Sequence, residues 1–394
     1  MQRFTPGIGD AFGPVEEEIK TAFLPELFKG VGDGAPGRKI TRLSVKQAVL
    51  ALPKPTRTDP DNWQASCVIT GHLVSVLRGQ VIFQTADHTS CLPDGRVAVR
   101  RKSVAKAMAS LEANIAGAPE VVIRRLRRAT KTGDWMTVQP STVKGMDLVA
   151  QEWRDAAFLR YGLKPPDLPK YCDGCNARFL ICYSLDCKRG GLVVARHNEL
   201  CDGVADLAGK AFTPSHVRND PLIYQCCAVK REKSKPSGPS ETTDPDDTPP
   251  EVTEQNGDLL LRDLWNNGTD SVHDMRVVNT DAKSYWGKSP EKCLEEAEKS
   301  KKKMYLERCL QQCRNFSPFV ASVDGLLGVE ATATLKRIAS CLTSKWRQSY
   351  SKTYRYVKSR IAITLVRATH WCIRGVTGAC TQDQCAETVV GRRG

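Results

Sequence analysis

Two aspartates stand on short apolar runs joined by a polar turn, in the stretch GDLLLRDLWNNGTDSVHDMRVV. Asp258 lies at the end of one predicted strand, and alternation along VHDMRVV places Asp274 and Arg276 on one face of the next. Two carboxylates that converge at a sheet edge can hold a hard divalent ion, while a neighbouring cation steadies a phosphate or a water. The pattern therefore predicts metal-dependent phosphodiester hydrolysis. Aspartates at strand ends also act as turn formers and caps, which is the structural alternative.

A second candidate site is the cysteine group in CDGCNARFLICYSLDC. Cys172 and Cys175 form a C-x-x-C turn, and Cys182 and Cys187 follow. Two thiolates on a tight turn can share one zinc ion, and a second pair closes a tetrahedron. We expect one zinc ion on these four cysteines; the alternative is four unrelated thiols in a loop. The sixteen cysteines are spread over a long chain and indicate reduced thiols rather than a disulfide framework.

The charge of the chain predicts a nucleic-acid partner, DNA or RNA. The formal net charge is +14 at pH 7, and Lys and Arg gather in several runs. One run, VIRRLRRATK, contains Arg124, Arg125, Arg127 and Arg128; another, KWRQSYSKTYRYVKSR, interleaves aromatic residues. Each single run is also explained by a solvated helix face, but their number favours a surface that neutralises phosphates.

Composition indicates a globular protein of 394 residues, 41% hydrophobic and 26% charged. The N-terminal residues show no basic segment followed by an apolar one, and no stretch reaches the roughly 18 apolar residues of a membrane helix. We therefore expect a nuclear or cytoplasmic protein that is neither secreted nor membrane-bound. Neither a phosphate-binding G-x-x-x-x-G-K-[ST] loop nor a polymerase Y-x-D-D motif is present in the sequence.

Glycine and proline divide the chain into regions. Residues 1–45 are rich in both and are expected to be loosely ordered, and 46–165 form a predicted basic helical module whose last helix lies within 140–162. Residues 166–192 hold the cysteine group. The last region, 193–394, includes a Pro, Ser and acid-rich insertion at 230–257 that we expect to be disordered.

Within the last region the periodicity alternates between helix and strand. A helical stripe consists of Leu200, Val204, Leu207 and Ala211. Strands are predicted at 217–225, 258–265, 272–278 and 318–325, and two helices close the chain.

A further helix is expected to begin at Ser289 and Pro290, and its apolar stripe is broken by a lysine. The stripe consists of Leu294, Ala297, Lys301 and Tyr305. A buried ammonium is costly unless it is paired, so we expect Lys301 to face the aspartates or a substrate phosphate. The alternative is that Lys301 extends to solvent along its stem while Arg276 supplies the positive charge.

Residues 150–374, approximately, resemble the region downstream of the polymerase in non-LTR retrotransposons that carry a restriction-like endonuclease. The resemblance is carried by the knuckle CDGC…C, by ARHNELCDGVADL after it, and by GD…HDMRVV…KKKMY. It implies a PD-(D/E)xK fold, which is a mixed sheet flanked by helices in the α+β or α/β class. It also implies an endonuclease that nicks DNA so that the 3′ end can prime reverse transcription, and a chain that is the C-terminal part of such an element or a piece surviving as its own gene.

The resemblance assigns roles to individual residues. Asp258 and Asp274 match the two catalytic aspartates that hold Mg²⁺. The motif lysine, which can move to the following helix in this group, falls on the run from Lys301 to Lys303, and the helical stripe selects Lys301. Glu199 matches an acidic position that some relatives add to the metal site.

Three positions depart from the family pattern. Tyr183 stands where the knuckle usually has histidine, so Cys182 would have to act as the ligand; Gly257 replaces a proline; and Arg276 replaces a lysine. Arginine stays charged and cannot serve as a base. The alternative function is therefore a catalytically degenerate nucleic-acid-binding protein. Arg196 and His197, in the segment RHN, are candidate nucleic-acid contacts, although a lone histidine is also explained as a core residue.

Overall fold

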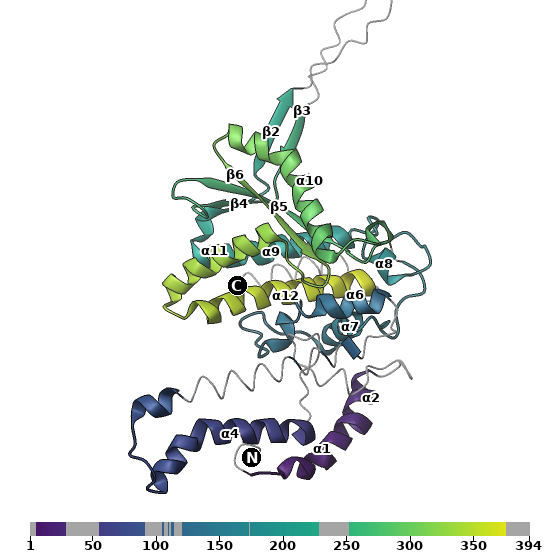
Figure 1. The fold of residues 1–394 in the computed structure, drawn as a ribbon. Coiled ribbons are helices and arrows are strands. Elements are labelled where there is room, and N and C mark those ends of the chain that lie inside the picture. Colours follow the sequence, from purple (N-terminus) through teal and green to yellow (C-terminus); the bar gives the residue numbers. More distant parts are fainter. Residues whose placement is uncertain are drawn as a thin grey trace, which may run out of the picture. The chain divides into compact units, whose positions relative to one another are not determined.

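A computed structural model describes residues 5–28, 55–90, 105, 109, 112–113, 120–172, 174–227 and 252–375 (Figure 1). In this part of the chain the fold is α+β, as predicted. The chain divides into two compact units, the first composed of 1–192, 324–326 and 365–394 and the second of 193–323 and 327–364. The predicted last region, 193–394, is therefore divided, because its residues 324–326 and 365–375 group with the first unit. No helix in the described ranges is both long and apolar enough to cross a membrane.

The first unit is mainly helical where it is described. Its helices are η1 (Ile8–Phe12), α1 (Gly13–Glu18), η2 (Ile19–Phe23), α2 (Leu24–Leu27), α4 (Pro55–Leu77), α6 (Glu120–Ala129), η5 (Asp134–Thr137), α7 (Ala150–Arg160) and α8 (Ile181–Ser184). Four of these, α4, α6, η5 and α7, lie in the predicted basic helical module. Most of the module's residues 91–119 lie outside the described part of the chain.

Of residues 1–45, which were expected to be loosely ordered, 5–28 are described and are mainly helical, whereas 1–4 and 29–45 lie outside the described residues. Continuous helical turns run from Ile8 to Leu27, and Leu24 and Phe28 are buried in a core cluster with α6 and α7. The Phe28 ring lies 5.6 Å from that of Phe158 and 5.7 Å from that of Tyr161, measured between centroids. Apolar residues four apart share one helix face, so burial of this face outweighs the glycine and proline content.

Helix α7 is shorter than predicted. The expected helix lay within 140–162, but the segment before Ala150 forms turns in which Gly145 has a positive φ of 59°. Val149 starts the helix, and the Glu152 carboxylate accepts its backbone N–H at 2.9 Å. Gly162, with φ of 73°, follows its end as predicted.

The second unit contains the sheet and its helices. Its elements are α9 (Leu192–Ala211), η6 (Pro214–His216), β1 (Val217–Asn219), β2 (Leu222–Cys227), β3 (Val252–Asn256), β4 (Leu259–Arg262), β5 (Asp270–Val278), η7 (Lys283–Tyr285), α10 (Pro290–Gln311), β6 (Asn315–Ser322), α11 (Val329–Trp346) and α12 (Tyr350–Arg374). Helix α9 starts, and helix α12 ends, in the first unit.

The sheet is mixed and has the strand order β1-β4-β5-β6. Strands β1, β4 and β5 pair antiparallel, while β5 and β6 pair parallel. A parallel pair requires a crossover, which α10 provides. In Figure 1, α10 and α11 lie on opposite sides of this sheet. Leu259 and Leu261 on β4 are fully buried, as is Val272 on β5.

Two predictions, one of a strand and one of a disordered insertion, are corrected by the structure. The strand expected at 217–225 is two strands, because Asp220 adopts a positive φ of 48° and Pro221 offers no N–H to a ladder. The insertion predicted at 230–257 is described only from residue 252 onward, and there it forms β3, which pairs antiparallel with β2. The remainder of that insertion lies outside the described residues.

The predicted helical stripes are confirmed. Leu200, Val204 and Leu207 of α9 are fully buried. The Ser289 side chain caps α10 by accepting the Lys292 backbone N–H at 3.2 Å. Periodicity of 3.6 residues thus placed the buried faces of both helices correctly.

Candidate functional site

The two aspartates of the opening motif lie on neighbouring strands. Leu259 pairs with His273, and the Asp258 amide donates to the His273 carbonyl oxygen at 3.0 Å, so Asp258 comes directly beside Asp274. Asp258 Oδ2 accepts the backbone N–H of Met275. Opposed residues have Cβ atoms about 4.5–5.5 Å apart, which brings both carboxylates within reach of one site. Asp258 immediately precedes β4, whereas Asp274 lies within β5.

Lys301 joins this pair from α10. Its ammonium forms an ion pair with Asp274 Oδ2, and the two side chains are 20% and 6% exposed. Lys301 Nζ also lies 5.6 Å from the centroid of the Tyr305 ring, one helical turn further on. Burial raises the pKa of Asp274, and Asp258 adds to this effect while Lys301 opposes it. Lys301 therefore faces the sheet as predicted, rather than extending to solvent.

His197 reaches the same carboxylates from α9. Its Nε2 lies 3.1 Å from Asp258 Oδ1, and the hydrogen bond it donates there raises the pKa of the imidazole against the effect of burial. Cys201, one turn along α9, places its Sγ 3.5 Å from His197 Nε2. Burial raises the pKa of the Cys201 thiol. His197 is predicted from the sequence only as a core or nucleic-acid-facing residue, and Cys201 is not predicted at all. The signal that could have identified both is their spacing of four, which places them on one helix face.

The other predicted residues near this site lie differently. Arg196 is only 2% exposed, so it cannot contact a nucleic-acid phosphate, and that prediction is wrong. Glu199 is half-buried and leaves α9 about 200° around the helix from His197. Arg276 is half-buried on β5, two residues beyond Asp274 and on the same face. The metal-site role of Glu199 and the phosphate role of Arg276 stay predictions.

Gly257 replaces the proline that the resemblance to restriction-like endonucleases would lead us to expect, and the packing explains the glycine. A Cβ added there would lie 2.5 Å from Val272 Cγ1 and 3.3 Å from Ile223 Cδ1. The Gly257 amide also donates to the Pro221 carbonyl oxygen at 2.9 Å, a bond that proline cannot make. Glycine at 257 thus holds the backbone that presents Asp258 in this chain.

The cysteine group forms a cluster of three thiols. The sulfur atoms of Cys172, Cys175 and Cys187 all lie within 4.8 Å of one another, whereas Cys182 is not among them. The predicted set of four is therefore wrong in one member. Three thiolate sulfurs at this separation fit one transition-metal ion, since Zn–S bonds of about 2.3 Å place tetrahedral sulfurs about 3.8 Å apart.

Tyr183 approaches the cluster in place of Cys182. Its hydroxyl lies 3.0 Å from Cys175 Sγ. This hydrogen bond lowers the pKa of Cys175 to about 7 and raises that of Tyr183 to about 12. The lowered pKa of Cys175 favours the thiolate, which is the form of cysteine that binds metal.

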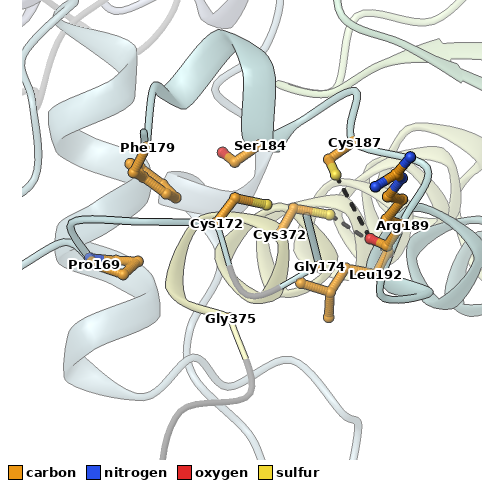
Figure 2. Close-up of a pocket in the computed structure, with 10 residues that line it drawn as sticks. All are labelled: Pro169, Cys172, Gly174, Phe179, Ser184, Cys187, Arg189, Leu192, Cys372 and Gly375. Atoms are coloured by element: carbon orange, nitrogen blue, oxygen red, sulfur yellow. Dashed lines mark hydrogen bonds between the residues drawn. The ribbon is translucent and has the colours of Figure 1, made fainter. Parts of the chain in front are cut away.

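Two glycines close the loop around the cysteine cluster. A Cβ at Gly174 would lie 2.1 Å from the Arg189 carbonyl oxygen, and one at Gly190, which has φ of 81°, would lie 2.8 Å from Gly174 Cα. Figure 2 shows the cavity beside the cluster, which is lined by Cys172, Cys187 and, from α12, Cys372. A Gly174→Ala substitution should therefore open the loop, and the zinc binding proposed below for the cluster should be lost with it, measurable as loss of one bound ion. Gly191→Ala has open space at Cβ but φ of 77°, and it should retain the ion.

The four predicted arginines of α6 do not form one surface. Arg128 is 5% exposed and forms an ion pair with Asp324, so it stabilises the fold rather than binding phosphate. Arg124 and Arg125 are half-buried. Arg127 is exposed and lies 3.5 Å from Glu112. The prediction is wrong for Arg128, and Arg127 is the most accessible of the four.

A basic and aromatic surface lies where α11 meets α12. The Tyr350 and Tyr354 rings stack with centroids 5.7 Å apart and planes 6° apart. Lys358 Nζ lies 6.0 Å from the Tyr354 centroid. Exposed cations on this surface are Arg347, Lys352 and Arg355. Stacked rings beside exposed cations suit a nucleic-acid strand.

No protein-family model matches this chain, and a comparison with curated proteins finds no match.

Proposed function

We propose that this chain is a metal-dependent DNA endonuclease of the PD-(D/E)xK type, from a retrotransposon protein that nicks DNA to prime reverse transcription. The observation that carries the proposal is the ion pair between Lys301 and Asp274, with Asp258 on the adjoining strand. Two acids at the adjoining central strands β4 and β5, together with a lysine from helix α10, are the constellation that phosphodiester hydrolysis needs.

The residues have separate roles in this proposal. Asp258 and Asp274 offer the oxygen ligands that Mg²⁺ prefers, and Mg²⁺, when bound, supplies Lewis-acid stabilisation of the charge that develops on the phosphate. Lys301 sits against Asp274 and places a positive charge where the scissile phosphate would enter. His197 holds Asp258 Oδ1, while the Met275 amide holds Oδ2. The Asp258 carboxylate is therefore fixed before substrate arrives.

A nucleic-acid-binding protein without catalysis is the second candidate. It is favoured by Arg276 in place of the motif lysine and by the basic and aromatic surface at the start of α12. This candidate keeps phosphate binding but assigns the Lys301–Asp274 pair a structural role.

Nicking of supercoiled plasmid separates the two candidates. Wild-type chain with Mg²⁺ or Mn²⁺ should nick the plasmid, and Asp274→Asn, which keeps the side-chain volume but removes the charge, should not. Asp270→Asn is the matched control, because Asp270 is on the same strand but pairs with Arg262 at 3.7 Å. If wild-type chain binds DNA yet leaves plasmid intact with either metal, the non-catalytic candidate is correct.

We further propose that the cysteine cluster holds one zinc ion through Cys172, Cys175 and Cys187. Cys187→Ser should remove one equivalent of zinc, whereas Cys182→Ser should remove none, because Cys182 is outside the cluster. Tyr183→His should tighten zinc binding, since imidazole is a better zinc ligand than phenol. Metal analysis after dialysis measures all three. Loss of zinc in Cys182→Ser would instead support the four-cysteine set.

The DNA-binding proposal predicts a strong dependence on salt. Each neutralised phosphate contributes about 0.9 to the slope of log affinity against log salt concentration. Reversing Arg347, Lys352 and Arg355 together to Glu should therefore reduce that slope by about 2 to 3. Fluorescence anisotropy on labelled duplex at several salt concentrations gives the slope. An unchanged slope would place the DNA-binding surface elsewhere.

A further inference from the structure

Three side chains of different chemistry converge beside the aspartate pair. His197 and Cys201 lie one turn apart on α9, and Asp258 stands at the start of β4. One imidazole nitrogen, one sulfur and one carboxylate oxygen from these residues lie within 4.8 Å of one another. Two of these contacts are short, at 3.1 Å from His197 to Asp258 and 3.5 Å from Cys201 to His197.

The backbone around these three residues is rigid. The two α9 residues share a helix face because they are four apart, which fixes their relative direction without loop closure. The same helix is anchored by Leu200 and Val204, both fully buried. The Met275 amide binds Asp258 Oδ2, so that Oδ1 is the oxygen turned to His197. Support of a ligand's second atom in this way is the usual arrangement around protein metal sites.

We propose that His197, Cys201 and Asp258 form a second transition-metal site, suited to Zn²⁺, that shares Asp258 with the Mg²⁺-binding pair. The donor set is one nitrogen, one sulfur and one oxygen. Imidazole and thiolate select zinc and similar ions, whereas Mg²⁺ takes oxygen ligands in an octahedron. Three protein ligands leave a fourth tetrahedral position open.

Sharing of Asp258 has a regulatory consequence, which rests on the nuclease proposed above. Because the Met275 amide binds Asp258 Oδ2, a zinc ion on Oδ1 occupies the oxygen that Asp258 would offer to Mg²⁺. Zinc binding and Mg²⁺-dependent nicking should therefore compete. The metal binding itself does not depend on the nuclease proposal.

The test is zinc stoichiometry of the full-length chain after equilibrium dialysis, with Zn²⁺ alone as the probe. Wild type should bind two equivalents, and Cys201→Ser and His197→Gln should each bind one. Cys313→Ser is the matched control, since Cys313 is an exposed cysteine of the same unit, and it should bind two. Retention of two equivalents by Cys201→Ser overturns the proposal.

Cobalt substitution gives a second measurement, which can be read from proteins that remain folded. In Cys187→Ser, which should remove the ion from the cysteine cluster, the remaining thiolate-to-cobalt absorption should disappear on adding Cys201→Ser. If Cys187→Ser does not fold, the difference spectrum between wild type and Cys201→Ser should carry the same band, and a flat difference spectrum overturns the proposal.

Nicking assays measure the competition between zinc and Mg²⁺. The zinc concentration that halves the nicking rate, relative to the same protein without zinc, should be at least tenfold higher for Cys201→Ser than for wild type. Zinc bound at this site without any nicking by wild type would leave the site standing and remove the nuclease proposal alone.

Discussion

Lys301→Ala should lower the rate of plasmid nicking by at least about 100-fold, because removing one positioned charge from a transition state typically costs a factor of 10² to 10³. The affinity for duplex DNA should stay within about twofold of the wild-type value. Lys301 is one-fifth exposed and its ammonium contacts Asp274, so it is held at the acidic pair before substrate binds. It is a small part of the total basic surface, and binding should change little. Single-turnover nicking and anisotropy binding, on the same preparations, measure the two effects separately.

Two neighbouring substitutions serve as controls for Lys301. Lys303 is on the same helix but exposed, so Lys303→Ala should nick at close to the wild-type rate. Arg276→Ala tests the alternative source of positive charge, and we expect a much smaller loss than for Lys301→Ala. If Arg276→Ala abolishes nicking and Lys301→Ala does not, the catalytic cation is Arg276 and the lysine assignment fails.

The sequence predicted those parts of the site that depend on local periodicity. The stripe on α10 placed Lys301 on the face toward the sheet because 3.6-residue periodicity fixes direction within one helix. The alternation of side chains between the two faces of β5 similarly predicted the face on which Asp274 lies. His197 meets Asp258 only through tertiary packing of α9 near β4, and nothing local to either residue specifies that contact.

Neighbouring residues on a short helix show a second limit of sequence spacing. Cys182 and Tyr183 both lie on α8, where successive side chains leave about 100° apart. Sequence spacing alone does not show which of the two side chains turns to the cluster. Cys182 was predicted because a thiolate is a better zinc ligand than a phenol. In the structure, the orientation of α8 about its axis places Tyr183, and not Cys182, against the cluster.

A run of basic residues in the sequence does not by itself define a nucleic-acid-binding surface, for a related reason. A basic run on a helix includes positions on the buried face, and a buried arginine is stable if a distant acid pairs with it. Arg128 has such a partner in Asp324, almost two hundred residues further along the chain. That partner cannot be inferred from the run VIRRLRRATK itself.

A buried ion pair in the first unit should dominate the stability of that unit. Asp155 of α7 is 1% exposed, and its Oδ2 lies 2.8 Å from Arg374 Nε, with Arg374 Nη2 on Oδ1. His370 Nδ1 also contacts Oδ2, at 2.7 Å. Asp155→Asn should lower the free energy of unfolding by about 3 kcal/mol, because removing one partner leaves a buried charge uncompensated. Denaturant titration followed by tryptophan fluorescence measures the loss.

The same pair predicts how stability changes with pH. Burial alone would raise the pKa of Asp155, but hydrogen bonds from Arg374 and His370 outweigh it and hold that pKa below its usual value. A carboxyl with a depressed folded pKa contributes stability that is present above its unfolded value of about 3.9 and is lost as pH falls through the folded value. Wild type should therefore lose stability more steeply than Asp155→Asn below about pH 4.

A double-mutant cycle provides the control for the ion pair. Asp155→Asn combined with Arg374→Met should lower the free energy of unfolding by less than the sum of the two single changes, since neither charge is then left unpaired. Additive losses would mean that Asp155 and Arg374 stabilise the unit independently, through packing rather than through their ion pair.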